Sequence, residues 1–334
     1  MKKVFAILLA GLLAVSVFAG CGAAASATSA TASAAGSTSA AEGTKEVKIG
    51  LLQLVEHASL DEIAAAVQAE LQAKAAENGL SITIDLQNAQ GDMSTINTIC
   101  QQYVADKVDL IIAIATPAAQ GAAAAVDGTG IPVIFSAVTD PVAAELVDSL
   151  DAPGGNITGT SDAIPVEQIF ALASELTPDV KSYGLIYNTS EVNSVSVIAE
   201  AKAYLDSVGI SYVEGAVTST GDVQTAAQNL LSKCDAVFSP IDNTVAAAMT
   251  VLADEAIKAG KPGYVAADSM VADGGLATVG VNYTNLGTQT ADMALKVLTG
   301  TAPADLPVEV LKDSAVVVNT ETAEAIGVDV SKYA

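Results

Sequence analysis

Short apolar runs alternate with longer amphipathic stretches along most of this chain, and the segment Val108–Gly121 displays the pattern clearly. Its run Leu110–Ala115 has no polar alternation, which predicts a strand buried on both faces of a parallel sheet. Thr116 and Pro117 then end the strand, and an alanine-rich helix is predicted from Ala118, with the Thr116 hydroxyl as a cap. This order favours an anion site at the carboxyl edge of a sheet, although an ordinary strand-to-helix turn has the same pattern.

The first half of the chain repeats this alternation of strand and helix. Asp92 or Ser94 is expected to cap one helix, while Ser59 caps another, with Glu62 three residues later. Short connections between such elements are typical of a parallel sheet covered by helices on both faces. The predicted strands are 47–54, 80–86, 110–115 and 131–137, and the predicted helices are 59–77, 92–106 and 118–126.

A second set of elements follows a short extended segment at 155–160 and a helix at 166–176, and it resembles the first set. Four positions recur at offsets of 126 to 134 residues, namely Gly50, Gly79, Asp109 and Gly130, which match Gly184, Gly209, Asp235 and Gly260. Shared constraints on strand–helix units produce part of this likeness, so it indicates structural repetition rather than proof of duplication. We therefore expect two lobes of similar build.

Strand 263–268 is predicted to be the fourth strand of the second lobe, and the elements after it are predicted to return to the first lobe and then to the second. These later elements are the strands 276–281, 307–311 and 315–319 and the helix 286–298. The expected fold is α/β, with two doubly wound parallel-sheet lobes formed by residues 46–161 plus 284–312 and by residues 162–283 plus 313–334. The crossings should form a hinge about a central cleft, at Ser161–Asp162, Asn282–Tyr283 and Lys312–Asp313.

The amino terminus has the pattern of a signal peptide. Residues 1–20 combine a basic start with the apolar run Val4–Phe18, which is too short for a convincing transmembrane helix. Ala19-Gly20-Cys21 resembles a bacterial lipobox, in which Cys21 carries lipid, although Phe18 stands where leucine is usual. A plain secreted protein, cleaved near Gly20, is the alternative. Residues 21–45 are rich in Ala, Ser and Thr and are expected to form a flexible tether on the extracytoplasmic face of the membrane.

Composition narrows the possible ligands. The net charge is −24, with 38 acids and 14 bases, which disfavours a nucleic-acid partner. All the bases are lysines, so an anionic ligand group must be held by backbone N–H groups, hydroxyls, amides or lysine rather than by arginine. Cys100 and Cys234 are predicted to lie in different lobes as core thiols. With His57 as the only histidine, no metal site and no cofactor are expected.

Residues that directly follow strands are expected to line the cleft. In the first lobe, hydroxyls and helix N-termini suit a carboxylate, whereas Asp242 and Asp268 in the second lobe suit an ammonium, so the pair of lobes would complement an amino acid. The aspartates are also candidates for helix caps, and the two roles can coexist. His57 is expected at the rim rather than as a catalyst. The candidate ligand-binding residues are Gln53, Glu56, Thr116, Ala118, Thr139, Asp140, Asn188, Glu191, Asp242, Asn243 and Asp268.

Several segments together resemble the tryptophan/tyrosine-type family of ABC transporter substrate-binding lipoproteins over Val47–Val328. They are EH at 56–57, NAQGD at 88–92, ATPAAQ at 115–120, VTDPV at 138–142, GNITGTSD at 155–162, YNTSEVNS at 187–194 and DN at 242–243. The resemblance implies a type I periplasmic-binding-protein fold. It also implies a monomer that captures a small, often aromatic, amino acid and delivers it to a membrane permease with its ATPase.

Other functions have less support in the sequence. The chain has no nucleophile elbow, P-loop or dinucleotide-binding glycine motif, which disfavours an enzyme. A sensor that presents ligand to a membrane kinase would use the same fold and stays an alternative. A sugar-binding protein is the other alternative, and the absence of tryptophan and arginine weighs against it.

Overall fold

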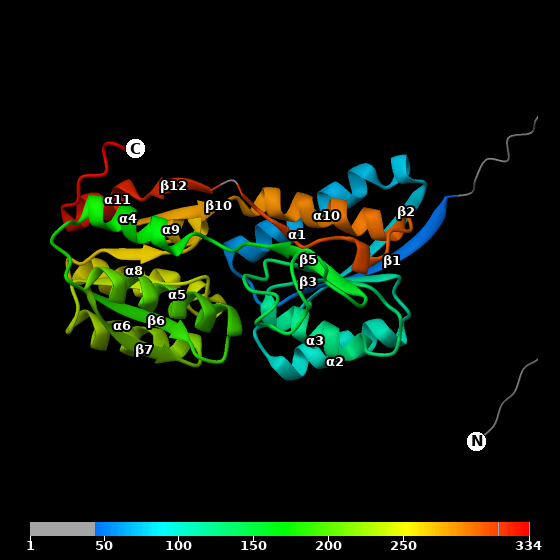
Figure 1. The fold of residues 1–334 in the computed structure, drawn as a ribbon, viewed down its shortest axis with the longest axis horizontal. Helices are drawn as coiled ribbons and strands as arrows, with labels where there is room; N and C mark the ends of the chain where they lie inside the picture. The colour runs from blue at the N-terminus through cyan, green and yellow to red at the C-terminus, as the bar shows by residue number, and fades with distance from the viewer. Residues whose placement is uncertain (1–43, 313, 334) are drawn as a thin grey trace, which may run out of the picture. The chain divides into compact units, whose positions relative to one another are not determined.

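The computed structural model describes residues 44–312 and 314–333, so the signal sequence, Cys21 and nearly all of the tether lie outside the described residues. The described chain forms two sheets of six strands each (Figure 1). The first contains β1 (Lys45–Gln53), β2 (Leu80–Asn88), β3 (Leu110–Ile114), β4 (Val133–Ser136), β5 (Ile157–Ser161) and β11 (Glu309–Val310). The second contains β6 (Ser182–Asn188), β7 (Ser211–Val217), β8 (Ala236–Ser239), β9 (Gly263–Val265), β10 (Ala277–Val281) and β12 (Ser314–Val318).

Helices cover both sheets, as the alternating pattern predicts. Around the first sheet are α1 (Ala58–Lys74), α2 (Met93–Ala105), α3 (Thr116–Val126) and α10 (Tyr283–Leu298). The second lobe contains α4 (Val166–Leu176), α5 (Val192–Val208), α6 (Val223–Leu231), α7 (Asn243–Ala246), α8 (Met249–Lys258), α9 (Asp268–Ala272) and α11 (Thr320–Ile326). Short 3-10 turns occur at Ala76–Asn78, Thr220–Asp222 and Pro303–Asp305.

The strand orders confirm the predicted architecture of two similar lobes. They are β11-β5-β4-β3-β1-β2 and β12-β10-β9-β8-β6-β7, so each sheet places its elements in the same sequence. All five residues of β3 are buried, as expected of a strand covered on both faces. One strand departs from the prediction, because β12 pairs antiparallel with β10. The chain reaches β12 directly from β11 of the other sheet, without the crossover helix that joins parallel strands, so β12 need not be parallel to β10.

The repeated residues occupy equivalent places in the two lobes. A Cβ atom on Gly50 would lie 2.5 Å from a ring carbon of Tyr103, and one on Gly184 would lie 2.9 Å from the Cys234 sulfur. Each glycine therefore leaves room for a neighbour to pack directly on its strand. The neighbour of Gly50 is Tyr103 of α2, and that of Gly184 is Cys234, which follows α6. Asp109 accepts a 2.8 Å hydrogen bond from the Lys48 N–H, just as Asp235 accepts one of 3.0 Å from the Lys181 N–H. The sequence repeat thus follows from a shared packing scheme.

The structure confirms the helix cap predicted at Asp92 and contradicts the one predicted at Ser59. Asp92 caps α2 as predicted, accepting the Thr95 N–H at 2.7 Å. Ser59 does not cap α1, because the helix begins at Ala58 with His57 at the N-cap position, and the Ser59 hydroxyl contacts the Ser269 hydroxyl instead. The helix also ends earlier than predicted, at Lys74.

Three segments connect the two sheets. The chain leaves β5 for α4 at Asp162, leaves β10 for α10 at Asn282, and passes from β11 to β12 through residues 311–313, of which Asp313 lies outside the described residues (Figure 1). Ser161 and Tyr283 are buried at the ends of the first two crossings. The residues expected to form a hinge therefore lie at these connections.

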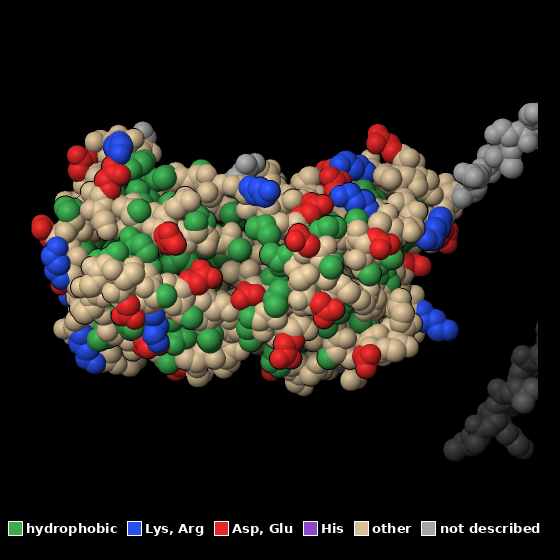
Figure 2. All heavy atoms as spheres, in the orientation of Figure 1, with side chains coloured by type: hydrophobic (Ala, Val, Ile, Leu, Met, Phe, Trp, Pro, Cys, Tyr) green, Lys and Arg blue, Asp and Glu red, His purple; other side chains and the backbone are tan. Residues whose placement is uncertain are grey.

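The surface and the core fit the composition. Figure 2 shows acidic side chains distributed over the viewed face of both lobes, with fewer basic ones, in keeping with the net charge of −24. Cys100 and Cys234 are free and buried, and burial raises the pKa of the Cys100 thiol to about 12. Across residues 44–312 and 314–333, the helices are all too short or too polar to cross a membrane.

Candidate ligand-binding site

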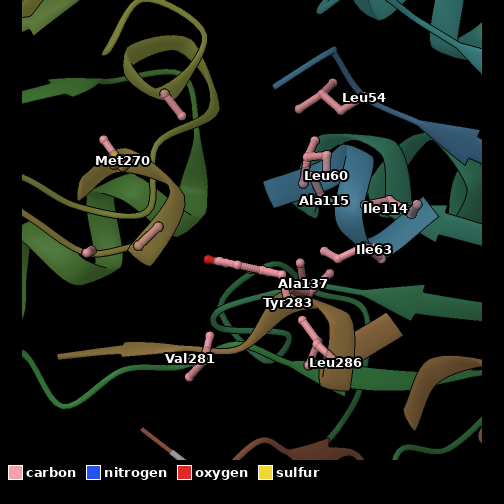
Figure 3. Close-up of a cluster of buried hydrophobic side chains, with 14 of the residues drawn as sticks. Leu54, Leu60, Ile63, Ile114, Ala115, Ala137, Met270, Val281, Tyr283 and Leu286 are labelled. Carbon is pink, nitrogen blue, oxygen red and sulfur yellow. The ribbon is translucent and has the colours of Figure 1, made fainter. Parts of the chain in front are cut away.

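A small cavity lies between the two lobes, and we call it the inner cavity. The volume open to the centre of a water molecule is about 10 Å³, which is room for about one water. Tyr283 extends from the start of α10 toward the lobe that contains Met270, and both residues line the cavity (Figure 3). The polar side chains around it include His57, Thr139, Asp162, Asn193, Asp242 and Asn243.

Asp162 is the buried acid on the hinge side of the inner cavity. It directly follows β5 and has no exposed surface. Thr139 donates a 2.9 Å hydrogen bond to Oδ1, and the Tyr283 hydroxyl donates a longer one of 3.5 Å to Oδ2. Burial raises the pKa of Asp162 to about 6, and the two hydroxyls only partly oppose that rise. We expected Asp162 in the hinge, and the structure also places it in the cavity wall.

Asp242 is the second buried acid. Its Oδ1 accepts the Val245 N–H at 2.8 Å and so caps α7, while Oδ2 accepts the Asn188 N–H at 2.6 Å and the Ser194 hydroxyl at 2.7 Å. Burial raises the pKa of Asp242, and the nearby Glu191 carboxylate raises it further. The capping role considered for Asp242 is therefore present, and the same carboxylate lines the inner cavity.

Glu191 and Asn188 hold the first residues of α7. The Glu191 carboxylate accepts hydrogen bonds from the Asn243 N–H at 3.1 Å and the Asn243 side-chain amide at 2.6 Å, and from the Thr244 hydroxyl at 2.9 Å. Asn188 donates to the same Thr244 hydroxyl at 2.8 Å. These contacts fix the start of α7 and with it the position of Asp242.

Asn193 is a cavity residue that the sequence analysis missed. Its amide nitrogen donates to the Ile241 carbonyl at 2.8 Å, but its buried Oδ1 has no hydrogen-bond partner. The rule that site residues directly follow strands did not find it, because it lies in the first turn of α5, five residues beyond the last residue of β6 at Asn188. Its place in the segment YNTSEVNS was the available signal.

The inner cavity thus presents acceptors without an opposing positive charge. Asp162, Asp242 and the free Oδ1 of Asn193 face it, and no lysine is among its described lining residues. A buried acceptor without a partner costs about 1–3 kcal/mol, so a donor-bearing group is favoured there. Within the described ranges, no group of three or more His, Cys, Asp or Glu side chains is arranged to hold a metal ion.

The start of α3 differs from the prediction made for it. Ala115 occupies the N-cap position with φ +82°, and Thr116 is the first helical residue. The Thr116 hydroxyl therefore makes no capping bond, and its buried oxygen has no partner at all. Ala118, two residues after Thr116, is fully buried. Ala137, directly after β4, also has a positive φ, of 55°, and strained non-glycine residues of this kind often mark functional sites.

The remaining first-lobe candidates are Gln53, Glu56 and Asp140. Gln53, the last residue of β1, donates to Asp61 in the first turn of α1 at 2.6 Å and to the Val55 carbonyl at 2.9 Å, which keeps its amide within its own lobe. Glu56 is exposed. Asp140 accepts the Ala143 N–H at 3.0 Å and, across the lobe boundary, the Ser196 hydroxyl at 3.2 Å. These three residues do not line the inner cavity within the described structure.

Asp268 also lies outside the inner cavity wall, contrary to the expectation that it pairs with Asp242. It begins α9, and its Oδ1 accepts the neighbouring Ser269 N–H at 2.8 Å. Burial raises the pKa of Asp268 and of Glu62 from the other lobe, and the charge of Asp268 raises that of Glu62 further. Asp268 therefore faces another acid, whereas Asp162, which we predicted only in the hinge, lines the cavity.

A second, wider cavity lies at the same lobe boundary, and we call it the outer cavity. Its volume open to the centre of a water molecule is about 500 Å³, in the range of pockets for small ligands. The first lobe contributes mainly apolar residues, including Leu54, Val55, Met93 and Pro117, and the second contributes polar ones, including Asn188, Glu191 and Thr244. Asn243 lines both cavities.

A comparison with protein families identifies the chain. Residues 48–333 match the model of the ABC transporter substrate-binding protein family. The chain belongs to this family. The substrate-binding protein is 37% identical over 97% of its length to a tyrosine-binding protein of Clostridioides difficile, covering 92% of that relative. The two lobes have the type I periplasmic-binding-protein fold, as the resemblance implied.

Two solved relatives show how the lobes of the substrate-binding protein are arranged. A Streptococcus pneumoniae domain in complex with L-Trp is 41% identical, with 87% and 99% of the two chains covered and a TM-score of 0.82. A ligand-free, open Clostridium difficile protein is 39% identical, with 85% and 95% covered and a TM-score of 0.65. Because the identities are similar, the difference in TM-score indicates that the lobes here lie closer to the arrangement of the L-Trp complex.

Proposed function

We propose that this substrate-binding protein captures an aromatic or other hydrophobic amino acid between its lobes and delivers it to a permease with its ATPase. The observation that carries the proposal is the inner cavity, where two buried carboxylates and an unpartnered amide oxygen await a positive donor group. The names of the relatives, one a tyrosine-binding protein and one a complex with L-Trp, support the same class of ligand. We expect no catalytic activity.

In this proposal the inner cavity receives the ligand ammonium. An ammonium group has three N–H donors and is close to water in size, so it suits a space for one water. Asp162, Asp242 and the Oδ1 of Asn193 would accept those donors. Both carboxylates already accept hydrogen bonds, and each has lone pairs left for one more.

The ligand carboxylate would lie at the start of α3. The first N–H groups of a helix have no partner within it, and the helix dipole favours negative charge there. Thr116 adds a buried hydroxyl without a partner, and Pro117 of the same turn lines the outer cavity. An apolar side chain would then extend into the outer cavity, against Leu54, Val55 and Met93.

Calorimetric titration with L-tryptophan and with indole-3-propionate, which lacks the amino group, tests the ammonium site. Losing a hydrogen bond to a charged group costs about 1.5–3 kcal/mol, or about 10- to 150-fold in affinity. Asp162→Asn and Asp242→Asn should lose that much affinity for tryptophan and much less for indole-3-propionate. Asp268→Asn is the matched control and should keep the wild-type preference. If neither cavity variant changes the preference, the ammonium assignment is wrong.

We further propose that the protein is a monomeric lipoprotein. Residues 1–20 would be removed as a signal peptide, Cys21 would carry the lipid, and residues 21–45 would tether the lobes to the extracytoplasmic face of the membrane. Cys21→Ser should move the protein from the membrane fraction to the soluble fraction of fractionated cells. Retention of the variant in the membrane would contradict the anchor.

A further inference from the structure

His57 is the only histidine of the chain, and its ring faces the other lobe. It occupies the N-cap position of α1, where its side chain makes no capping bond. Its Nε2 lies 3.3 Å from the Oδ1 of Asn243, which begins α7 in the second lobe. Since Asn243 lines both cavities and His57 lines the inner one, this contact lies where the walls of the two cavities meet.

The neighbours of Asn243 determine which atom of this contact is the donor. The Asn243 amide nitrogen donates to the Glu191 carboxylate at 2.6 Å, and a carboxylate only accepts, so the amide oxygen must face His57. An amide oxygen also only accepts, so Nε2 of His57 carries the hydrogen. Burial lowers the pKa of His57, which keeps the ring neutral, with its single N–H directed across the cleft.

We propose that His57 donates this N–H to the carboxylate of the bound amino acid, and that Asn243 Oδ1 holds the place of a carboxylate oxygen until the ligand arrives. The inference rests on the proposed function. A ligand with its ammonium in the inner cavity and its side chain in the outer one must place its α-carbon beside Asn243, which lines both cavities, and so must part His57 from Asn243. One carboxylate oxygen would then accept the His57 N–H, while the other faces the start of α3. The chain has no arginine for this task, which makes a buried N–H donor valuable.

The test compares L-tryptophan with L-tryptophanamide, whose amide replaces the carboxylate. His57→Leu removes the donor, whereas His57→Gln keeps an N–H donor on a side chain of similar reach. His57→Leu should lose about 10- to 150-fold in affinity for tryptophan and much less for the amide, and His57→Gln should keep most of the wild-type preference. Equal losses for both ligands in His57→Leu, or no loss for either, would overturn the proposal, because a role in packing alone cannot tell the two ligands apart.

A second measurement needs no variant. In tag-free protein labelled with ¹⁵N-histidine, the ring signals come from His57 alone. Tryptophan should shift the Nε2–H resonance in the direction of a stronger hydrogen bond, and tryptophanamide should shift it less. An Nε2 without a hydrogen, or identical spectra with the two ligands, would refute the assignment. Failure of the proposed function itself appears differently, as wild-type protein that binds no amino acid in the titration.

Discussion

At the scale of single residues, Asp162 is a fully buried acid whose burial carries a cost in stability. Its folded pKa is about 6, raised from an ordinary 3.8, so between about pH 4 and pH 6 the folded protein holds a proton that the unfolded chain releases. Stability therefore falls as pH rises through that window. A difference of about two pKa units corresponds to about 3 kcal/mol at pH 7. The ligand ammonium would offset this cost when it binds.

Urea unfolding of ligand-free protein from pH 4 to pH 7 tests this cost. An asparagine at position 162 does not titrate, so Asp162→Asn lacks this loss of stability. The free energy of unfolding of Asp162→Asn minus that of the wild type should therefore increase by about 3 kcal/mol from pH 4 to pH 7. The other acids titrate in both proteins and cancel in the difference. Parallel stability curves for the two proteins would contradict the pKa assignment.

Single residues also show where prediction from sequence stops. The rule that residues after strands line the cleft placed Thr139 and Asp242 in the cavity wall, where the structure has them, because the fold fixes the edge of each sheet. It could not tell that Gln53 is held by Asp61, since that depends on how the start of α1 packs beside the end of β1. It missed Asn193, whose free oxygen is recognisable only once its amide nitrogen is seen bonded to Ile241.

At the scale of elements, strands were predicted well because buried apolar runs leave few alternatives. Helix caps were predicted unevenly. Asp92 and Asp242 cap as short acids do at a helix start, but Ser59 and Thr116 lie one or two residues inside their helices. The Ser59 hydroxyl instead contacts the other lobe, and the Thr116 hydroxyl is left free at the proposed carboxylate site. Ser59 lines the inner cavity and Pro117, next to Thr116, lines the outer one, so both departures occur near the lobe boundary.

At the scale of the whole molecule, acidic side chains of one lobe lie near acidic side chains of the other across the lobe boundary. The contact between Ser59 and Ser269 brings Glu62 toward Asp268, and the bond from Ser196 to Asp140 brings Asp140 toward Glu200, one helical turn along α5. The pKa values of Glu62 and Glu200 are raised by burial and by those opposing acids. Like charges oppose closure, so we expect the ligand to supply the free energy that holds the lobes together.

The size of the inner cavity also indicates that the lobes must move when a ligand binds. The inner cavity holds about one water, so an amino acid can enter only when the lobes separate. We expect the separation to be a rotation about the three connections, with hinges at Ser161–Asp162, Asn282–Tyr283 and Lys312–Asp313. Those connections are short and join rigid sheets, which favours movement of each lobe as a body.

Small-angle scattering with and without L-tryptophan tests the central claim most directly, which is that an amino acid closes the lobes around itself. The radius of gyration of the wild type should fall when tryptophan is added at a concentration that calorimetry shows to be saturating. Indole-3-propionate, which offers no ammonium to Asp162 and Asp242, should produce little change. Identical scattering curves with and without saturating tryptophan would contradict the account.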